Sequence, residues 1–143
     1  MKDKALNLLG LMRKANAIQI GETDTGAAAR AQTAKLVLLA SDASDNAKSR
    51  ARGFVYGRSI PMIQLPFTKQ EISSKLGKPG CSMAAICDIG FADAFMKTMV
   101  GISDAYTPTA EQISIEYEKA KQRRKEKSAH ERNKKIGKRR NNA

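Results

Sequence analysis

The chain has 143 residues, of which 41% are hydrophobic and 5% are aromatic, and it contains no tryptophan. This length allows one compact domain and an additional segment, with a core built from aliphatic residues and methionine. The 26 Lys and Arg residues outnumber the 14 Asp and Glu residues, and the formal net charge of +12 makes polyanions the first partners to consider.

The cysteine and histidine content excludes several kinds of site. Cys81 and Cys87 have neither the spacing of metal ligands nor a CxxC pattern, and the single histidine, His130, lies far along the chain. We therefore expect no zinc site, no other metal and no cofactor, and we expect both thiols to be buried and reduced.

The N-terminal apolar run is not interpreted as a signal peptide. Asn7 and Gly10 interrupt it, and Arg13 and Lys14 follow it where a signal peptide would stay uncharged. No other run approaches the roughly 20 apolar residues of a membrane span. We expect a monomer in the cytoplasm that does not contact membranes.

The first hundred residues alternate between helical and strand patterns. Helices are predicted over residues 3–14, 22–32, 68–76 and 89–100, the third of them starting with a capping box at Thr68 and Glu71. A further helix is predicted to start after one of several possible caps at residues 41–45 and to reach about Tyr56. Strands are predicted over residues 17–20, 35–40, 60–65 and 81–88. This alternation predicts a three-layer α/β/α sandwich with a small mixed four-stranded sheet, formed by residues 1–103.

Residues 104–143 form a basic tail of a different character. Its last 25 residues contain 12 basic residues and two acidic ones, a net charge of +10. Ile113, Tyr117 and Ala120 form one short apolar stripe, and little apolar surface follows, so the tail is predicted to be helical or disordered. Its predicted phosphate contacts are Arg123, Arg124, Lys125, Lys134, Lys135, Lys138, Arg139 and Arg140.

The turn after the first strand is the most informative part of the domain. Gly21 permits a turn, and the polar run from Glu22 to Asp24 begins the next helix, whose free N–H groups suit a phosphate or a base edge. Two alternatives remain open here. Glu22 and Asp24 either contact a ligand or only complement the helix dipole, and Arg13 and Lys14 either cap the first helix or contact a phosphate beside Gly21.

Four segments carry a resemblance to a known family. Residues 9–15, which lead to Gly21, and residues 34–44, 76–78 and 88–92 resemble the L-seven-Ae ribosomal protein superfamily, most closely its small bacterial YlxQ-like members. The resemblance covers roughly residues 3–100 and leaves the tail unmatched. It implies an α/β/α sandwich that binds RNA, often a kink-turn, which is a sharply bent internal loop with sheared G·A pairs.

The resemblance also implies which residues contact RNA. The turn after the first strand contacts the G·A pairs, and the loop before the last strand covers an extruded base. Gly21 matches the motif glycine, Thr23 stands where many members have asparagine or lysine, and Asp24 where many have glutamate or glutamine. Ala27 replaces a usual lysine, which removes one RNA contact. The predicted RNA-binding residues are Arg13, Lys14, Gly21, Glu22, Thr23, Asp24, Lys78, Gly80, Cys81, Ser82 and Met83.

These observations predict a non-enzymatic protein that binds structured RNA, kink-turn-like or ribosomal, in association with the ribosome or translation. The alternative is an adaptor or assembly factor whose tail binds nucleic acid non-specifically. An enzyme is not expected, because the chain has no GxxxxGK phosphate loop and no room for the catalytic domain of an RNA methyltransferase, about 150 further residues.

Overall fold

The computed structural model describes residues 1–79 and 81–141, with side chains described through Asn133. Six α-helices, a short 3₁₀ helix and four strands lie in this part of the chain. In order they are α1 (Lys2–Lys14), β1 (Ile18–Ile20), α2 (Glu22–Arg30), β2 (Leu36–Leu39), α3 (Asp45–Val55), β3 (Met62–Gln64), α4 (Lys69–Leu76), β4 (Met83–Ile86), α5 (Ile89–Ile102), η1 (Asp104–Tyr106) and α6 (Thr107–Asn141).

The four strands form one mixed sheet in the order β1-β4-β2-β3. β4 is antiparallel to both β1 and β2, whereas β2 and β3 are parallel. All residues of β2 and β4 are buried, as expected for central strands covered on both faces.

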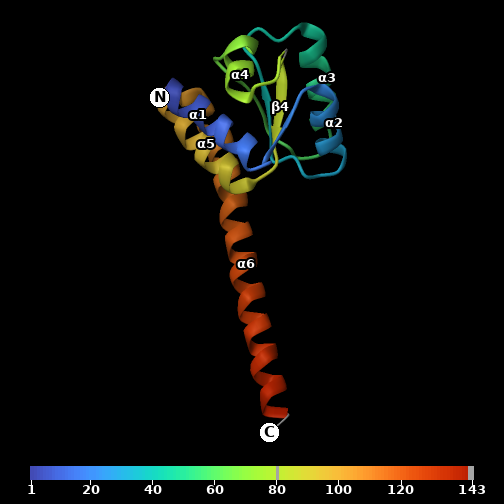
Figure 1. Cartoon of the computed structure of the whole chain (residues 1–143), viewed down its shortest axis with the longest axis vertical. Helices are drawn as coiled ribbons and strands as arrows, with labels where there is room; N and C mark the ends of the chain where they lie inside the picture. The colour runs from blue at the N-terminus through green and yellow to red at the C-terminus, as the bar shows by residue number, and fades with distance from the viewer. Residues whose placement is uncertain (80, 142–143) are drawn as a thin grey trace.

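Helices cover both faces of the sheet and give the three layers that the sequence predicts. α1 and α5 lie on one side of β4, and α2 and α3 lie on the other (Figure 1). The larger core cluster contains Leu9, Phe95 and other side chains on the first side, and the smaller one is built mainly from alanines such as Ala47 and Ala51. The predicted α/β/α fold is therefore confirmed.

Local chemistry accounts for where several helices start and end. The predicted capping box is present, because Thr68 Oγ1 accepts from the Glu71 N–H at 3.2 Å and Glu71 Oε1 accepts from the Thr68 N–H at 3.1 Å. Asp88 caps α5 by accepting from the Phe91 N–H at 2.9 Å. α2 ends two residues before its predicted end, since Gln32 adopts a left-handed conformation with φ of 61°.

The tail forms the long helix α6, so the helical alternative is the one the structure shows. Its first turns pack on the domain: Ile113 is 1% exposed and belongs to the larger core cluster. Tyr106, just before the helix, donates from its hydroxyl to the Gln64 carbonyl at 2.8 Å. The core thus includes residues beyond 103, and the later turns of α6 extend away from the domain (Figure 1).

Polar pairs accompany the exposed part of α6. Lys119 and Lys121 each lie 3.6 Å from a glutamate three residues earlier, and Gln122 donates to Glu126 at 3.3 Å. Such pairs stabilise a helix that lacks a continuous apolar face. In the part of the chain that the structure describes, no helix combines the length and apolar character needed to cross a membrane.

Candidate functional site

The sheet topology brings the two predicted recognition segments together. Because β1 and β4 are antiparallel neighbours, the end of β1 lies beside the start of β4, and Ile20 is opposite Ala84. The Gly21 N–H donates to the Met83 carbonyl at 3.0 Å. We call the surface formed by residues 21–24, 77–79 and 81–82 the loop end of the domain.

Gly21 has a backbone conformation that other residues rarely adopt. Its φ of 93° and ψ of 168° lie in a region that is essentially restricted to glycine. α2 starts immediately afterwards and has no side-chain cap, so its first N–H groups lack an intrahelical partner. The turn therefore presents unpaired donors at the positive end of a helix dipole, which is suited to anionic or acceptor groups.

The two acidic residues of this turn are paired with cations. Arg50 of α3 donates to both carboxylate oxygens of Glu22, at 2.8 and 2.9 Å. Lys78 Nζ lies 3.8 Å from Asp24 Oδ2 and donates to the Ile20 carbonyl at 3.4 Å. These cations offset the negative charge beside the free N–H groups. The contact of Arg50 was not predicted, because it joins residues 28 positions apart.

Arg13 and Lys14 are exposed at the end of α1. Arg13 lies against Gly77, since a Cβ built on that glycine would be 3.3 Å from Arg13 Nη1. Both basic residues line a groove that also includes Ser74 and Lys75. Their position at the margin of the loop end is compatible with either alternative, the helix cap or the phosphate contact.

The loop before β4 is buried at two of the residues predicted to contact RNA. Cys81 is 2% exposed and Met83 is 1% exposed, so both side chains belong to the core, as expected for a buried thiol and a strand residue. Burial raises the pKa of the Cys81 thiol above its ordinary value. Ser82 is half-buried and remains available at the surface, and the predicted contact of Gly80 lies outside the described residues.

The remaining site residues differ in accessibility. Thr23, Asp24 and Lys78 are exposed, and Ala27, at the position where the resemblance expects lysine, is exposed on α2 as well. The loop end therefore consists of the hydroxyls of Thr23 and Ser82, two paired acid–base contacts and free backbone donors. No group of three or more possible metal ligands occurs among the described residues.

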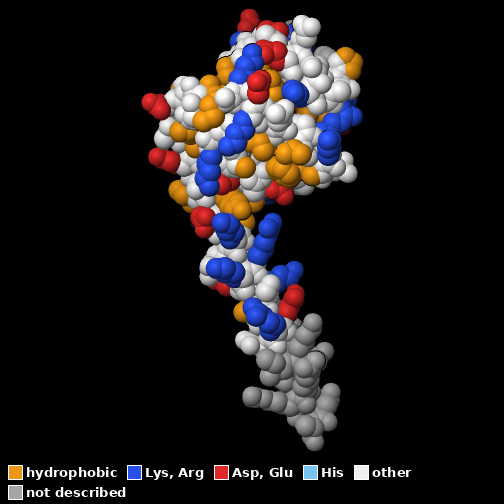
Figure 2. Space-filling view, turned by 60° about the vertical axis from the view of Figure 1, so that its left-hand side comes forward, with side chains coloured by type: hydrophobic (Ala, Val, Ile, Leu, Met, Phe, Trp, Pro, Cys, Tyr) orange, Lys and Arg blue, Asp and Glu red, His pale blue; other side chains and the backbone are white. Residues whose placement is uncertain are grey.

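The tail residues lie at the other end of the sheet. Ala120 and Arg123 of α6 line a pocket with Lys35, before β2, and Ile89, after β4. These positions lie where β4 ends, whereas β4 starts at the loop end, so the two sites are at opposite ends of the sheet. Arg124 and Lys125 are exposed, and Lys and Arg side chains follow α6 as it leaves the domain (Figure 2). Lys134, Lys135, Lys138, Arg139 and Arg140 lie beyond the described side chains.

Comparisons with known proteins agree with this fold. No protein-family profile matches the chain. A curated relative, the RNA-binding protein YlxQ of Enterococcus faecium, is 37% identical over 91 residues, which cover 64% of this chain and 86% of the relative.

Two solved structures are also similar. A protein of unknown function from Bacillus halodurans has a TM-score of 0.59 at 27% identity, over 64% of this chain and 92% of the other. The 15.5 kD RNA-binding protein of Giardia lamblia has a TM-score of 0.54 at 18% identity, over 71% of this chain and 85% of the other, and indicates the fold alone.

Fold and loop arrangement are consistent with a domain of the L-seven-Ae superfamily, which the resemblance implied. The identity to the Enterococcus protein and its coverage narrow the assignment further: this chain belongs to the YlxQ family.

Proposed function

We propose that this chain is a non-enzymatic RNA-binding protein that recognises a structured RNA, either kink-turn-like or ribosomal, through the loop end. We further propose that it acts in the cytoplasm as a monomer associated with the ribosome or with translation. The observation that carries the proposal is the Gly21 turn, held against the loop before β4 by the bond from its N–H to the Met83 carbonyl.

This arrangement supports recognition of unpaired or distorted RNA. The free N–H groups of α2 and the exposed hydroxyl of Thr23 can bond base edges or phosphates, whereas a regular RNA duplex hides the major-groove edges of its bases in a deep, narrow groove. Lys78 adds positive charge directly beside these groups. The name of the Enterococcus relative, an RNA-binding protein, supports the same class of partner.

The basic helix α6 supports a separate, sequence-independent contribution. Each phosphate that a protein neutralises changes the slope of log affinity against log salt by roughly 0.7 to 0.9. Arg124 and Lys125 are exposed on the part of α6 that leaves the domain. Their loss should therefore weaken binding to every RNA alike and reduce the salt dependence.

The test is a binding measurement by fluorescence anisotropy with the full chain. A kink-turn RNA and a plain duplex of equal length are compared at about 0.05 and 0.2 M salt, a range over which non-specific contacts weaken strongly. We expect a preference for the kink-turn that persists at the higher salt. Lys78→Ala should reduce that preference, whereas the double variant Arg124→Gln/Lys125→Gln should reduce the salt slope and leave the preference unchanged.

Lys4→Gln is the control for Lys78→Ala, since Lys4 is exposed on α1 and each of these two substitutions removes one positive charge. Equal binding of both RNAs, unaffected by Lys78→Ala, would contradict recognition by the loop end and favour the adaptor alternative. Substitutions are preferred to removal of residues 104–143, because that deletion would take the buried Ile113 out of the core.

A further inference from the structure

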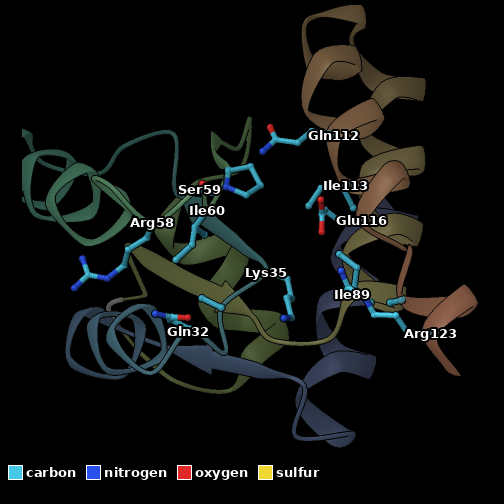
Figure 3. A pocket seen from close by; sticks show the side chains of 13 residues that line it. Gln32, Lys35, Arg58, Ser59, Ile60, Ile89, Gln112, Ile113, Glu116 and Arg123 are labelled. Atoms are coloured by element: carbon cyan, nitrogen blue, oxygen red, sulfur yellow. The ribbon is translucent and has the colours of Figure 1, made fainter. Parts of the chain in front are cut away.

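The pocket lined by Lys35, Ile89 and Arg123 lies at the end of the sheet opposite the loop end. It has a volume of about 350 Å³, within the range of small-molecule sites, and its walls come from segments far apart in the sequence. One wall is formed by residues 32–35 and 58–61, and the other by Ile89 and the first turns of α6 (Figure 3).

The lining combines the chemical groups that a nucleotide requires. Ile60, Pro61 and Ile89 give half-buried apolar surface against which a base can lie. Gln32 and Gln112 carry amides that can donate to and accept from a base edge. Figure 3 shows Gln112 reaching from α6 toward the opposite wall.

Cations and one carboxylate complete the pocket. Lys35 lies between the two walls, and Arg123 comes from α6 (Figure 3). Among the described side chains, neither of these cations forms an ion pair. Both remain available for a phosphate. Arg58 lies at the outer rim and donates to the Phe54 carbonyl at 3.2 Å.

Glu116 distinguishes a nucleotide from a simple anion. Its carboxylate projects from α6 into the pocket, where it would repel inorganic phosphate but can accept hydrogen bonds from ribose hydroxyls (Figure 3). Lys119 lies 3.6 Å from Glu116 Oε1 and offsets part of its charge. A ligand with a phosphate at one end and a ribose beside it satisfies both signs of charge.

The backbone of the first wall is held in an uncommon conformation. Gln32 and Ser59 are two of the three residues other than glycine with positive φ in the described chain, at 61° and 55°. Such conformations cost free energy and are frequent at ligand sites. Both residues line this pocket.

We infer that this pocket binds a single ribonucleotide, with its phosphate at Lys35 and Arg123, its ribose at Glu116 and its base between Pro61 and Ile89. The nucleotide is either free or an unpaired residue of an RNA strand. This inference does not depend on the proposed function of the loop end, because the two sites share no residues.

The test is a titration of the ¹⁵N-labelled full chain with AMP, followed by amide chemical shifts. AMP is added up to about 10 mM, which captures millimolar binding. We expect the shifts to be confined to the amides of residues 32–35, 58–60, 89 and 112–123. Adenosine and inorganic phosphate should each bind about tenfold more weakly than AMP, since each lacks part of the charged or apolar contact.

Two variants examine the assigned roles. Lys35→Ala should weaken AMP binding about tenfold through the lost phosphate contact, whereas the control Lys4→Ala removes an exposed lysine elsewhere and should have no effect. Wild-type protein should prefer AMP to dAMP, and Glu116→Gln should abolish that preference. The second variant provides a readout that a general loss of charge or stability would not produce.

A tetraadenylate distinguishes the two sources of the nucleotide. Tighter binding than AMP with the same pattern of shifts identifies an unpaired residue of a strand, and equal or weaker binding identifies a free nucleotide. Either result supports the pocket. Absence of shifts with AMP, shifts spread over all basic surfaces, or an equal effect of Lys4→Ala would overturn the inference.

Discussion

The conformation of Gly21 leads to a prediction about stability that has a built-in control. In Gly21→Ala, the added Cβ would have no atom within 4 Å, so the substitution introduces no clash with neighbouring residues. What it does introduce is a backbone penalty, because φ of 93° and ψ of 168° are poorly accessible to alanine. Residues other than glycine in such regions cost about 1 to 3 kcal/mol.

Gly53 provides the comparison. It lies within α3, and a Cβ there would also have no atom within 4 Å, but its φ is not positive. Gly53→Ala should therefore stabilise the protein by about 0.5 to 1 kcal/mol through the higher helix propensity of alanine. The same chemical change is expected to have opposite signs at the two positions.

Thermal unfolding followed by circular dichroism measures both effects. With an unfolding entropy of about 2.1 cal/mol/K per residue, Gly21→Ala should lower Tm by about 3 to 10 °C and Gly53→Ala should raise it by about 2 to 3 °C. A Tm for Gly21→Ala equal to or above the wild-type value would refute the argument that this turn requires glycine. If Gly21→Ala and Gly53→Ala both lowered Tm, loss of backbone contacts, rather than the positive φ of Gly21, would account for the destabilisation.

Three further predictions concern the core and the helix caps. Ile113→Ala should destabilise the protein by about 2 to 5 kcal/mol in urea unfolding, since Ile113 is 1% exposed. As a control on the same helix, Ile115→Ala should change stability by less than about 0.5 kcal/mol, because Ile115 is 57% exposed. An equally small effect of Ile113→Ala would show that α6 does not pack on the domain. Thr25 is fully buried, and its hydroxyl has no hydrogen-bond partner among the described residues. Thr25→Val should therefore be neutral or stabilise the protein by about 1 kcal/mol. Destabilisation by more than about 1 kcal/mol in urea unfolding would reveal a partner for the hydroxyl. The pKa of Glu71 is lowered below 4.5, mainly by the hydrogen bond from Lys2 and further by that from the Thr68 N–H. The Glu71 carboxylate should therefore stabilise the protein above about pH 4.5, and this stabilisation should be lost as the pH falls through the lowered pKa. Glu71→Gln should flatten this part of the curve of stability against pH, and an unchanged curve would show that Glu71 does not cause it.

The sequence was sufficient for the fold because its local signals agree with one another. The continuous apolar run at residues 36–39 indicates a strand covered on both faces, and the Thr68 and Glu71 pair starts α4 as a capping box must. Strand boundaries were less accurate. Residues 60–65 form a strand only from Met62 to Gln64, since Pro61 has no N–H to donate to a neighbouring strand.

Part of the candidate site could be predicted, and part depends on long-range contacts. Gly21 was recognisable as a turn because glycine permits unusual backbone angles. The burial of Cys81 and Met83 agrees with the sequence, which predicted buried thiols and a strand that includes both residues. The contact of Arg50 with Glu22 needs two helices on the same face of the sheet. The roles of all these residues in binding RNA stay predictions.

The packing of α6 also depends on tertiary structure. The stripe of Ile113, Tyr117 and Ala120 is too short to indicate by itself where the helix docks. The structure buries Ile113, leaves Tyr117 half-buried and leaves Lys121 4.4 Å from the centre of the Tyr117 ring. A tail that composition describes only as basic is therefore joined to the domain at a defined position.

That position has a consequence for the RNAs that the protein can engage. The part of α6 after Arg123 extends for about 27 Å at about 1.5 Å per residue, and it leaves from the end of the sheet opposite the loop end. On the proposed function, the chain is bivalent, with a selective contact at one pole and an electrostatic contact at the other. An RNA large enough to reach both poles gains from the high effective concentration of the second contact, and a small hairpin does not. Discrimination would then depend on the size of the folded RNA as well as on its local structure.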